Sequence, residues 1–209
     1  MGYFRAGFEV VGVDNRPQPR YPFRFVEADA LEYLAEHGAE YDVIHASPPC
    51  QCYCQVNVAD RKAGKTYPDL VGPTRELLEA AGKPYVIENV VTAPLRNAVM
   101  LCGSSFALPI RRHRLFESSQ VLFGTECNHG WQLRSGIRYP TCFQPKGGMR
   151  NTSSVVQVYG NTTGKKLWPM ALGIDWMNSR GLSQAIPPCY TEFLGRQLLA
   201  QLGDNFYAQ

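Results

Sequence analysis

The chain has 209 residues, 44% of them hydrophobic, and a formal net charge of +3, which suits one domain, or one domain with a small addition, built around a real core. Its apolar runs are shorter than the ~18 residues of a membrane span, and the start "MGYFRAGFEVVGVD" lacks the pattern of a signal peptide. The cysteine count is odd, with three thiols crowded into 50–54, so we expect reduced thiols in a cytoplasmic protein with no membrane contact, rather than a secreted disulfide framework.

The first part of the sequence alternates between β-branched runs and segments with helical spacing. Residues 1–7 fit the end of a helix that stops at Gly7. The same reasoning predicts strands at residues 8–14, 22–29, 41–47, 84–90, 99–106 and 112–119, and helices at 30–38 and 73–82. This alternation predicts an α/β domain with a largely parallel sheet.

From residue 123 to 168 the periodicity weakens, and a final amphipathic helix is predicted at 187–203. We therefore expect an α/β domain at 1–122, a small irregular region at 123–168, and a C-terminal segment at 169–209 that returns to the first domain. No Asp or Glu occurs between Cys127 and Ile174. The basic residues of that stretch are Arg134, Arg138, Lys146, Arg150, Lys165 and Lys166. Interleaved with aromatic residues, they suit a nucleic acid partner, although a solvated basic loop has the same composition.

Three short motifs place reactive side chains at the ends of predicted strands. In "SPPCQ" two prolines stiffen the turn that carries Cys50, although a lone cysteine is usually a small buried hydrophobe. In "ENV" the carboxyl of Glu88 could act as a general acid, or could be an ordinary acid at a strand end. In "RRHRLFE" Arg112 and Arg114 share one face of a strand, as binding residues or as a solvated basic edge.

The order of these motifs resembles the cytosine-C5 DNA methyltransferases, and is most similar to small phage and actinobacterial members. That family carries Pro-Cys-Gln, then Glu-Asn-Val, then Arg-x-Arg with apolar and aromatic residues, as this chain does. "VGVD" and "EADALEYL" resemble its cofactor strands, and "LGIDWM" and "LSQAIPPCYTEFLG" resemble its last motifs more loosely. The likeness covers nearly the whole chain.

The resemblance implies a Rossmann-like fold for S-adenosylmethionine-dependent methyl transfer, with the irregular region recognising double-stranded DNA. It implies attack of Cys50 on C6 of an extruded cytosine, with Glu88, Asn89, Arg112 and Arg114 completing the site. It further implies S-adenosylmethionine contacts from Asp14, Asp29 and Pro49, no metal, and a monomer in a prokaryotic or phage-infected cell, as in restriction-modification.

The sequence departs from the family pattern at its start. The family's first strand and glycine-rich cofactor turn have no counterpart here, and that strand lies between the strands ending near Asp14 and Ser47. We interpret Met1 as an internal methionine of a longer protein, and expect this form to be weakly active or inactive. A decayed chain, or another segment filling the gap, are the alternatives.

Other functions stay open at this point. A non-catalytic DNA-binding relative without a cofactor pocket is the main alternative, and a thiol redox or zinc protein built on the cysteine cluster is another. Cys127, His129 and Cys142 are three candidate zinc ligands without an evident fourth, at a spacing that is not one of the strong zinc patterns.

Overall fold

The structure, a computed structural model, describes residues 1–134, 137–140, 152–159 and 164–206. The chain divides into two compact units. Unit 1 consists of Met1–Val10, Leu101–Arg112 and Thr125–Gln209, and unit 2 of Val11–Met100 and His113–Gly124. Within the described ranges, no helix combines the length and apolar character needed to cross a membrane.

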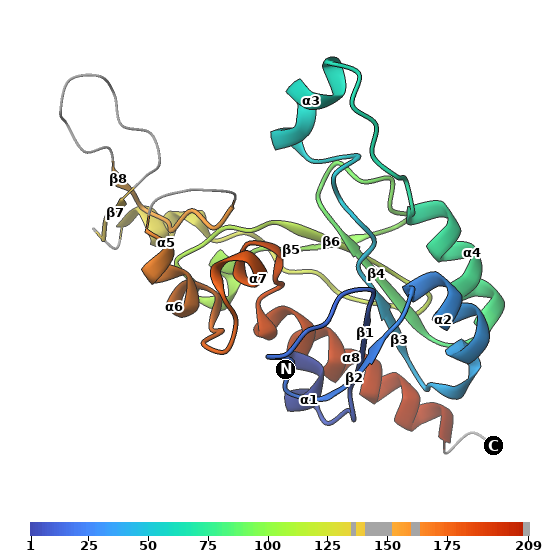
Figure 1. Cartoon of the computed structure of the whole chain (residues 1–209). Helices are drawn as coiled ribbons and strands as arrows, with labels where there is room; N and C mark the ends of the chain where they lie inside the picture. Colours follow the sequence, from blue (N-terminus) through green and yellow to red (C-terminus); the bar gives the residue numbers. More distant parts are fainter. Residues whose placement is uncertain (135–136, 141–151, 160–163, 207–209) are drawn as a thin grey trace. The chain divides into compact units, whose positions relative to one another are not determined.

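Unit 2 is a mixed α/β structure (Figure 1). Its strands are β1 (Val11–Asp14), β2 (Arg24–Glu27), β3 (Ile44–Ala46), β4 (Tyr85–Asn89) and β6 (Arg114–Ser118), and β5 (Val99–Leu101) ends at the boundary with unit 1. Its helices are α2 (Ala30–His37), α3 (Val58–Lys62) and α4 (Val71–Ala81), with short 3₁₀ turns at Gly38–Glu40 and Gln55–Asn57.

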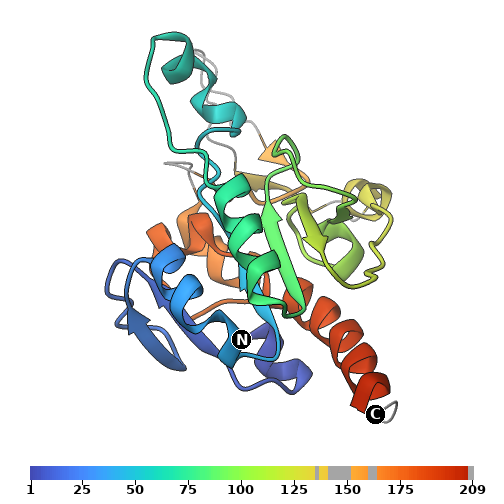
Figure 2. The same ribbon diagram turned by 90° about the vertical axis from the view of Figure 1, so that its right-hand side faces the viewer.

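The central strand of unit 2 is β4, whose residues are all buried. It pairs in parallel with β3 and antiparallel with β6, so the four-stranded sheet, in the order β3-β4-β6-β5, is mixed rather than largely parallel. Tyr85 and Ile87 alternate on one face and pack against Leu34 of α2 and Leu78 of α4. These two helices therefore cover that face of the sheet (Figure 2).

A second, two-stranded sheet stands apart from the first within unit 2. β1 pairs in parallel with β2, and no ladder joins β1 to β3 among the described residues. Among the described residues, β1 and β3 therefore each have a strand partner on one side only.

Unit 1 contains the remaining helices of the described residues. They are α1 (Gly2–Ala6), α5 (His129–Arg134), α6 (Trp168–Leu172), α7 (Ser179–Gln184) and α8 (Pro188–Phe206), with 3₁₀ turns at Gly103–Phe106 and Lys165–Leu167. A short antiparallel pair joins β7 (Tyr139–Pro140) to β8 (Thr152–Ser153). The core gathers around Trp168, Leu172 and Ile174 of the C-terminal half and Ile110 of the middle segment.

Helix α1 packs closely on α8. A Cβ at Gly2 would lie 2.0 Å from Thr191 Oγ1, and one at Gly195 would lie 2.8 Å from Ala6 Cβ, so both glycines permit the approach. Gly7, at φ 116°, ends α1 in the left-handed conformation, as the sequence predicts. Helix α8 belongs to the same compact unit as α1. The expected return of residues 169–209 to a first domain at 1–122 stays a prediction.

The predicted strand at 99–106 is only partly correct. The strand stops at Leu101, and Gly103–Phe106 form a 3₁₀ turn. A Cβ at Gly103 would lie 2.5 Å from the carbonyl oxygen of Ile110, and Ala107 adopts a left-handed φ of 55°. The chain therefore reverses where the β-like composition predicts that it continues.

Candidate functional site

The thiol of Cys50 lies in the loop that follows β3. We call residues 47–54 the thiol loop. Its backbone turns tightly, because the amides of Tyr53 and Cys54 both donate to the Cys50 carbonyl at 2.9 Å. Two contacts hold it from outside: Arg61 Nη1 donates to the Cys54 carbonyl at 2.9 Å, and Thr92 Oγ1 donates to the Tyr53 carbonyl at 2.8 Å. The thiol loop is thus held by one residue of α3 and by one residue that follows β4.

A second thiol activates the first. Cys54 Sγ donates a hydrogen bond to Cys50 Sγ at 3.1 Å. This hydrogen bond lowers the pKa of Cys50 from 9.0 to about 6, against a raising effect of burial, and the Arg114 guanidinium adds to the lowering. The effect on the donating thiol is the opposite, since the same hydrogen bond, together with burial, raises the pKa of Cys54. Cys50 is therefore largely a thiolate at neutral pH, and Cys54 stays protonated.

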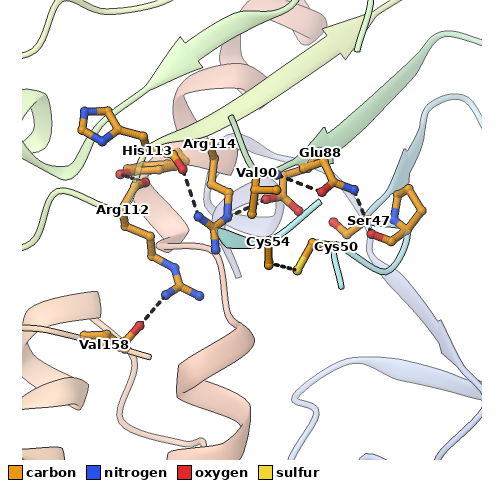
Figure 3. Close-up of polar contacts among 12 residues, drawn as sticks. Ser47, Cys50, Cys54, Glu88, Val90, Arg112, His113, Arg114 and Val158 are labelled. Atoms are coloured by element: carbon orange, nitrogen blue, oxygen red, sulfur yellow. Dashed lines mark hydrogen bonds and ion pairs between the residues drawn. The ribbon is translucent and has the colours of Figure 1, made fainter. Parts of the chain in front are cut away.

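An ion pair lies beside the thiols. Arg114 Nε, at the start of β6, lies 2.9 Å from Glu88 Oε1 near the end of β4, with the two side chains 17% and 8% exposed. Strand pairing sets this contact, because Glu88 is in register with Phe116 and Asn89 with Leu115. Figure 3 shows the pair next to the Cys50–Cys54 contact. The thiolate thus has a cation and a carboxylate within electrostatic reach.

Asn89 ties the thiol loop to the sheet. Its side chain is 1% exposed. Asn89 Nδ2 donates to the Pro48 carbonyl at 3.0 Å, while its Oδ1 accepts from the amide of Val90 at 2.9 Å. An amide with both ends bonded in this way has one stable orientation. The two prolines and Asn89 together therefore fix where the loop leaves β3.

Of the predicted catalytic residues, the structure brings Cys50, Glu88, Asn89 and Arg114 together within unit 2. Arg112 belongs to unit 1. Its guanidinium donates to the carbonyls of Val158 at 3.0 Å and Ser183 at 2.9 Å, and its backbone has a φ of 37°. These contacts give Arg112 a role in joining three segments of unit 1.

The residues expected to hold a cofactor lie at element ends of unit 2. Asp14 ends β1, and its Oδ1 accepts from the Arg16 amide at 2.9 Å. Asp29 caps α2, with the same oxygen accepting from two amides of the first turn. In the described part of the chain, Oδ2 of each carboxylate has no hydrogen-bond partner. Each can thus accept from a ligand hydroxyl or amine. Pro49 is an exposed residue of the thiol loop.

The basic residues expected to contact DNA are only partly described. Arg134, Arg138, Lys165 and Lys166 are exposed in unit 1, whereas Lys146 and Arg150 lie outside the described residues. Sequence reasoning missed Cys54 and Arg61 as parts of the site. The signal for Cys54 was its spacing of four residues from Cys50, which one turn of chain brings together.

Comparisons with protein-family models and with curated proteins found no match for this chain. The fold and the geometry of the site are therefore what bears on its function. Unit 2 is an α/β structure that holds an activated thiol, a carboxylate–guanidinium pair and an orienting amide where β3, β4 and β6 come together.

Proposed function

We propose that this chain is a DNA (cytosine-5-)-methyltransferase, with Cys50 as the nucleophile. The observation that carries the proposal is the activated thiol of Cys50 beside the Glu88–Arg114 pair, on a loop anchored by Asn89. The motif resemblance names the same residues independently of their geometry.

The chemistry needs an anionic sulfur at neutral pH. C5 of cytosine is a poor nucleophile until another group adds to the ring. When the Cys50 thiolate forms a bond to C6, the electrons of the C5–C6 double bond become available at C5. C5 would then take the methyl group as its bond to the sulfonium of S-adenosylmethionine breaks, with S-adenosylhomocysteine as the leaving group. A base then removes the C5 proton, and the thiolate leaves as the C5–C6 double bond returns. A pKa of about 6 keeps the sulfur ready for the first step.

Glu88 is the residue suited to assist that addition. Addition of the thiolate to C6 places negative charge on the ring, and a proton shared with N3 neutralises that charge. A carboxyl group positioned near N3 can share such a proton. Arg114 Nε fixes the orientation of this carboxyl at 2.9 Å. The target base reaches such a site only when it is extruded from the duplex, because C6 is covered in the stack.

S-adenosylmethionine would supply the methyl group. The open Oδ2 atoms of Asp14 and Asp29 suit its ribose hydroxyls and adenine amine, and no metal takes part in the proposed reaction. The nucleophile can be tested separately from the cofactor, because addition of the thiolate to C6 precedes methyl transfer.

Two assays make that separation. The first measures transfer of labelled methyl from S-adenosylmethionine to DNA. The second measures release of tritium from DNA carrying 5-tritiated cytosine without cofactor, because addition of Cys50 lets C5 exchange its hydrogen with water. We expect release by the chain and none by Cys50→Ala, whereas the matched loop variant Cys52→Ala keeps it. Release by Cys50→Ala, or no activity of the folded chain in both assays, would overturn the proposal.

One observation favours a second candidate function, a DNA-binding protein that no longer holds the cofactor. β1 and β3 share no neighbouring strand in the described residues, although the cofactor residue Asp14 ends β1. Isothermal titration with S-adenosylmethionine distinguishes the two. This candidate predicts DNA binding with neither cofactor binding nor tritium release, whereas release of tritium excludes it.

A further inference from the structure

A cluster of soft ligand side chains occurs in unit 1, outside the site described above. Cys102, Cys127 and His129 place their ligand atoms within 4.8 Å of one another. Cys102 comes directly after β5, and the other two open the segment that leads into α5. Cys102 Sγ lies 3.3 Å from His129 Nε2. Two parts of the sequence that are far apart thus converge on one point.

The spacing of these atoms suits a tetrahedral zinc site. With Zn–S near ~2.3 Å and Zn–N near ~2.0 Å, tetrahedral angles place a sulfur and a nitrogen roughly 3.5 Å apart. The observed separation of 3.3 Å is within a few tenths of an ångström of this value. The two thiolates carry two negative charges, which balance the two positive charges of the zinc ion, and the neutral imidazole adds none. The buried sulfur of Cys102 can therefore be a thiolate in the interior without leaving an unpaired charge.

The surroundings are already ordered around these ligands. Ser104 is 2% exposed, and its hydroxyl lies 3.1 Å from Cys102 Sγ and accepts from the Asn128 amide at 2.9 Å. Trp131 Nε1 donates to the Ser104 carbonyl at 2.8 Å, and Ser105 Oγ donates to the Glu126 carbonyl at 2.6 Å. Outer hydrogen bonds of this kind orient the ligands of metal sites.

We propose that Cys102, Cys127 and His129 bind a structural zinc ion. The ion fixes the start of the basic region, the acid-free stretch between Cys127 and Ile174, to the segment after β5. Structural zinc sites take four protein ligands. Cys102, Cys127 and His129 supply three of these. Of the ligands expected from the sequence, the proposal keeps Cys127 and His129 and adds Cys102, while Cys142 lies outside the described residues.

Metal content of the full chain is the first test. After purification without chelators and under reducing conditions, we expect one zinc ion per chain, measured by mass spectrometry. Replacing the zinc with cobalt should give the visible bands of a tetrahedral site and a sulfur-to-cobalt charge-transfer band. A chain that binds neither metal would overturn the proposal.

Variants assign the site. Cys102→Ser, Cys127→Ser and His129→Gln should each weaken zinc binding at least about tenfold, the loss that even outer-shell changes produce. Cys189→Ser, which removes a half-buried thiol elsewhere in unit 1, should bind zinc as the unchanged chain does. A Cys52→Ala/Cys54→Ala variant excludes the thiol loop, and should also keep the metal.

The outcomes separate the two ligand sets and guard against misfolding. Loss of metal in Cys142→Ser but not in Cys102→Ser would overturn the assignment, as would loss in the thiol-loop variant alone. Because loss of a ligand can unfold unit 1, the unchanged chain is also stripped with a chelator and titrated with cobalt. Return of the charge-transfer band supports the site, and its failure in a chain that keeps its circular dichroism contradicts it.

Discussion

At the scale of single residues, the pairing of Cys50 with Cys54 controls the reactivity of the site. We expect alkylation of Cys50 by iodoacetamide to reach half its maximal rate at a pH of about 6. Cys54→Ala removes the hydrogen-bond donor and should move this midpoint toward the ordinary value of 9.0. Cys54→Ser keeps a donor and should leave the midpoint acidic. Peptide mass spectrometry isolates Cys50 from the other thiols, and equal midpoints in both variants would contradict the role of Cys54.

Glu88 can be tested apart from the thiol. Glu88→Gln removes the proton that the carboxyl shares with the base, so tritium release should fall by about 100-fold or more, the usual contribution of a general acid. The carboxylate raises the pKa of Cys50, so its removal should leave alkylation of Cys50 as fast or faster. A variant that slows both reactions equally would point to a disturbed loop instead.

The sequence predicts part of this site and misses the rest for a physical reason. Cys50 follows one predicted strand and Glu88 lies near the end of another, so the meeting of those two ends could be expected from a parallel sheet. Arg114 lies at the start of β6, and only the antiparallel pairing of β6 with β4 brings it to the same place. The donor role of Cys54 depends on the turn at Cys50, in which the Cys54 amide bonds the Cys50 carbonyl. The contacts of Arg112 with Val158 and Ser183 depend on segments distant in sequence.

At the scale of elements, a buried ion pair joins α4 to β6. Arg75 Nε lies 2.6 Å from Glu117 Oε1, and Arg75 Nη2 lies 2.8 Å from Glu117 Oε2, with both side chains less than 9% exposed. Glu117→Gln leaves the guanidinium buried without its counter-ion, so the free energy of unfolding should fall by about 3–5 kcal/mol in urea titrations. Arg75→Met with Glu117→Leu should recover much of that loss. As a control, Glu192→Gln in the exposed pair with Arg196 should cost no more than about 1 kcal/mol.

The same pair sets a pH dependence. Burial raises the pKa of Glu117, but the hydrogen bonds from Arg75 and from the Arg96 amide outweigh it and hold the pKa below 4.5. The stability from this carboxylate is therefore present above pH 4.5 and is lost as the pH falls through the lowered folded-state pKa. Urea midpoints measured down this acid range should fall less steeply in Glu117→Gln, and parallel curves would contradict the assignment.

The gap between the two sheets of unit 2 predicts an uneven protection of backbone amides. β4 is hydrogen-bonded to a strand on both sides, β3 on one and β6 on the other. In the described residues, β1 is bonded to a strand on one side, by β2, and β3 is likewise bonded on one side, by β4. Hydrogen exchange followed by nuclear magnetic resonance should therefore show slow amides along β4 and fast ones on the facing edges of β1 and β3. Equal protection of β1 and β4 would mean that β1 has a further partner in solution.

Element prediction succeeded where local chemistry decides the structure. Gly7 and Gly82 end helices in the left-handed conformation, as their positions after amphipathic runs predict. It failed at residues 99–106, because the turn there depends on the close approach of Gly103 to Ile110. Helix α5 was also missed, since it is short and occurs in a segment with weak periodicity.

At the scale of the whole molecule, the path of the chain between its units was not predictable. The consecutive regions expected at 1–122, 123–168 and 169–209 stay a prediction. The chain leaves the first compact unit at Val10, returns at Leu101, leaves again at Arg112 and returns at Thr125. Helix α1 packs on α8, from the other end of the sequence. Local patterns carry no information about such long-range packing.

The distribution of charge predicts how the proposed DNA binding responds to salt. A net charge of only +3 gives little general attraction, so binding should depend on local contacts from the acid-free stretch between Cys127 and Ile174. Each phosphate contact releases counterions and contributes about 0.9 to the slope of log K against log salt. Arg138→Ala and Lys166→Ala, both exposed in unit 1, should each lower that slope by about this amount for any DNA sequence. The matched control is Arg20→Ala, an exposed cation of unit 2, which should leave the slope unchanged. Slopes measured by fluorescence anisotropy that are equal for all three variants would place the DNA contact outside the basic region.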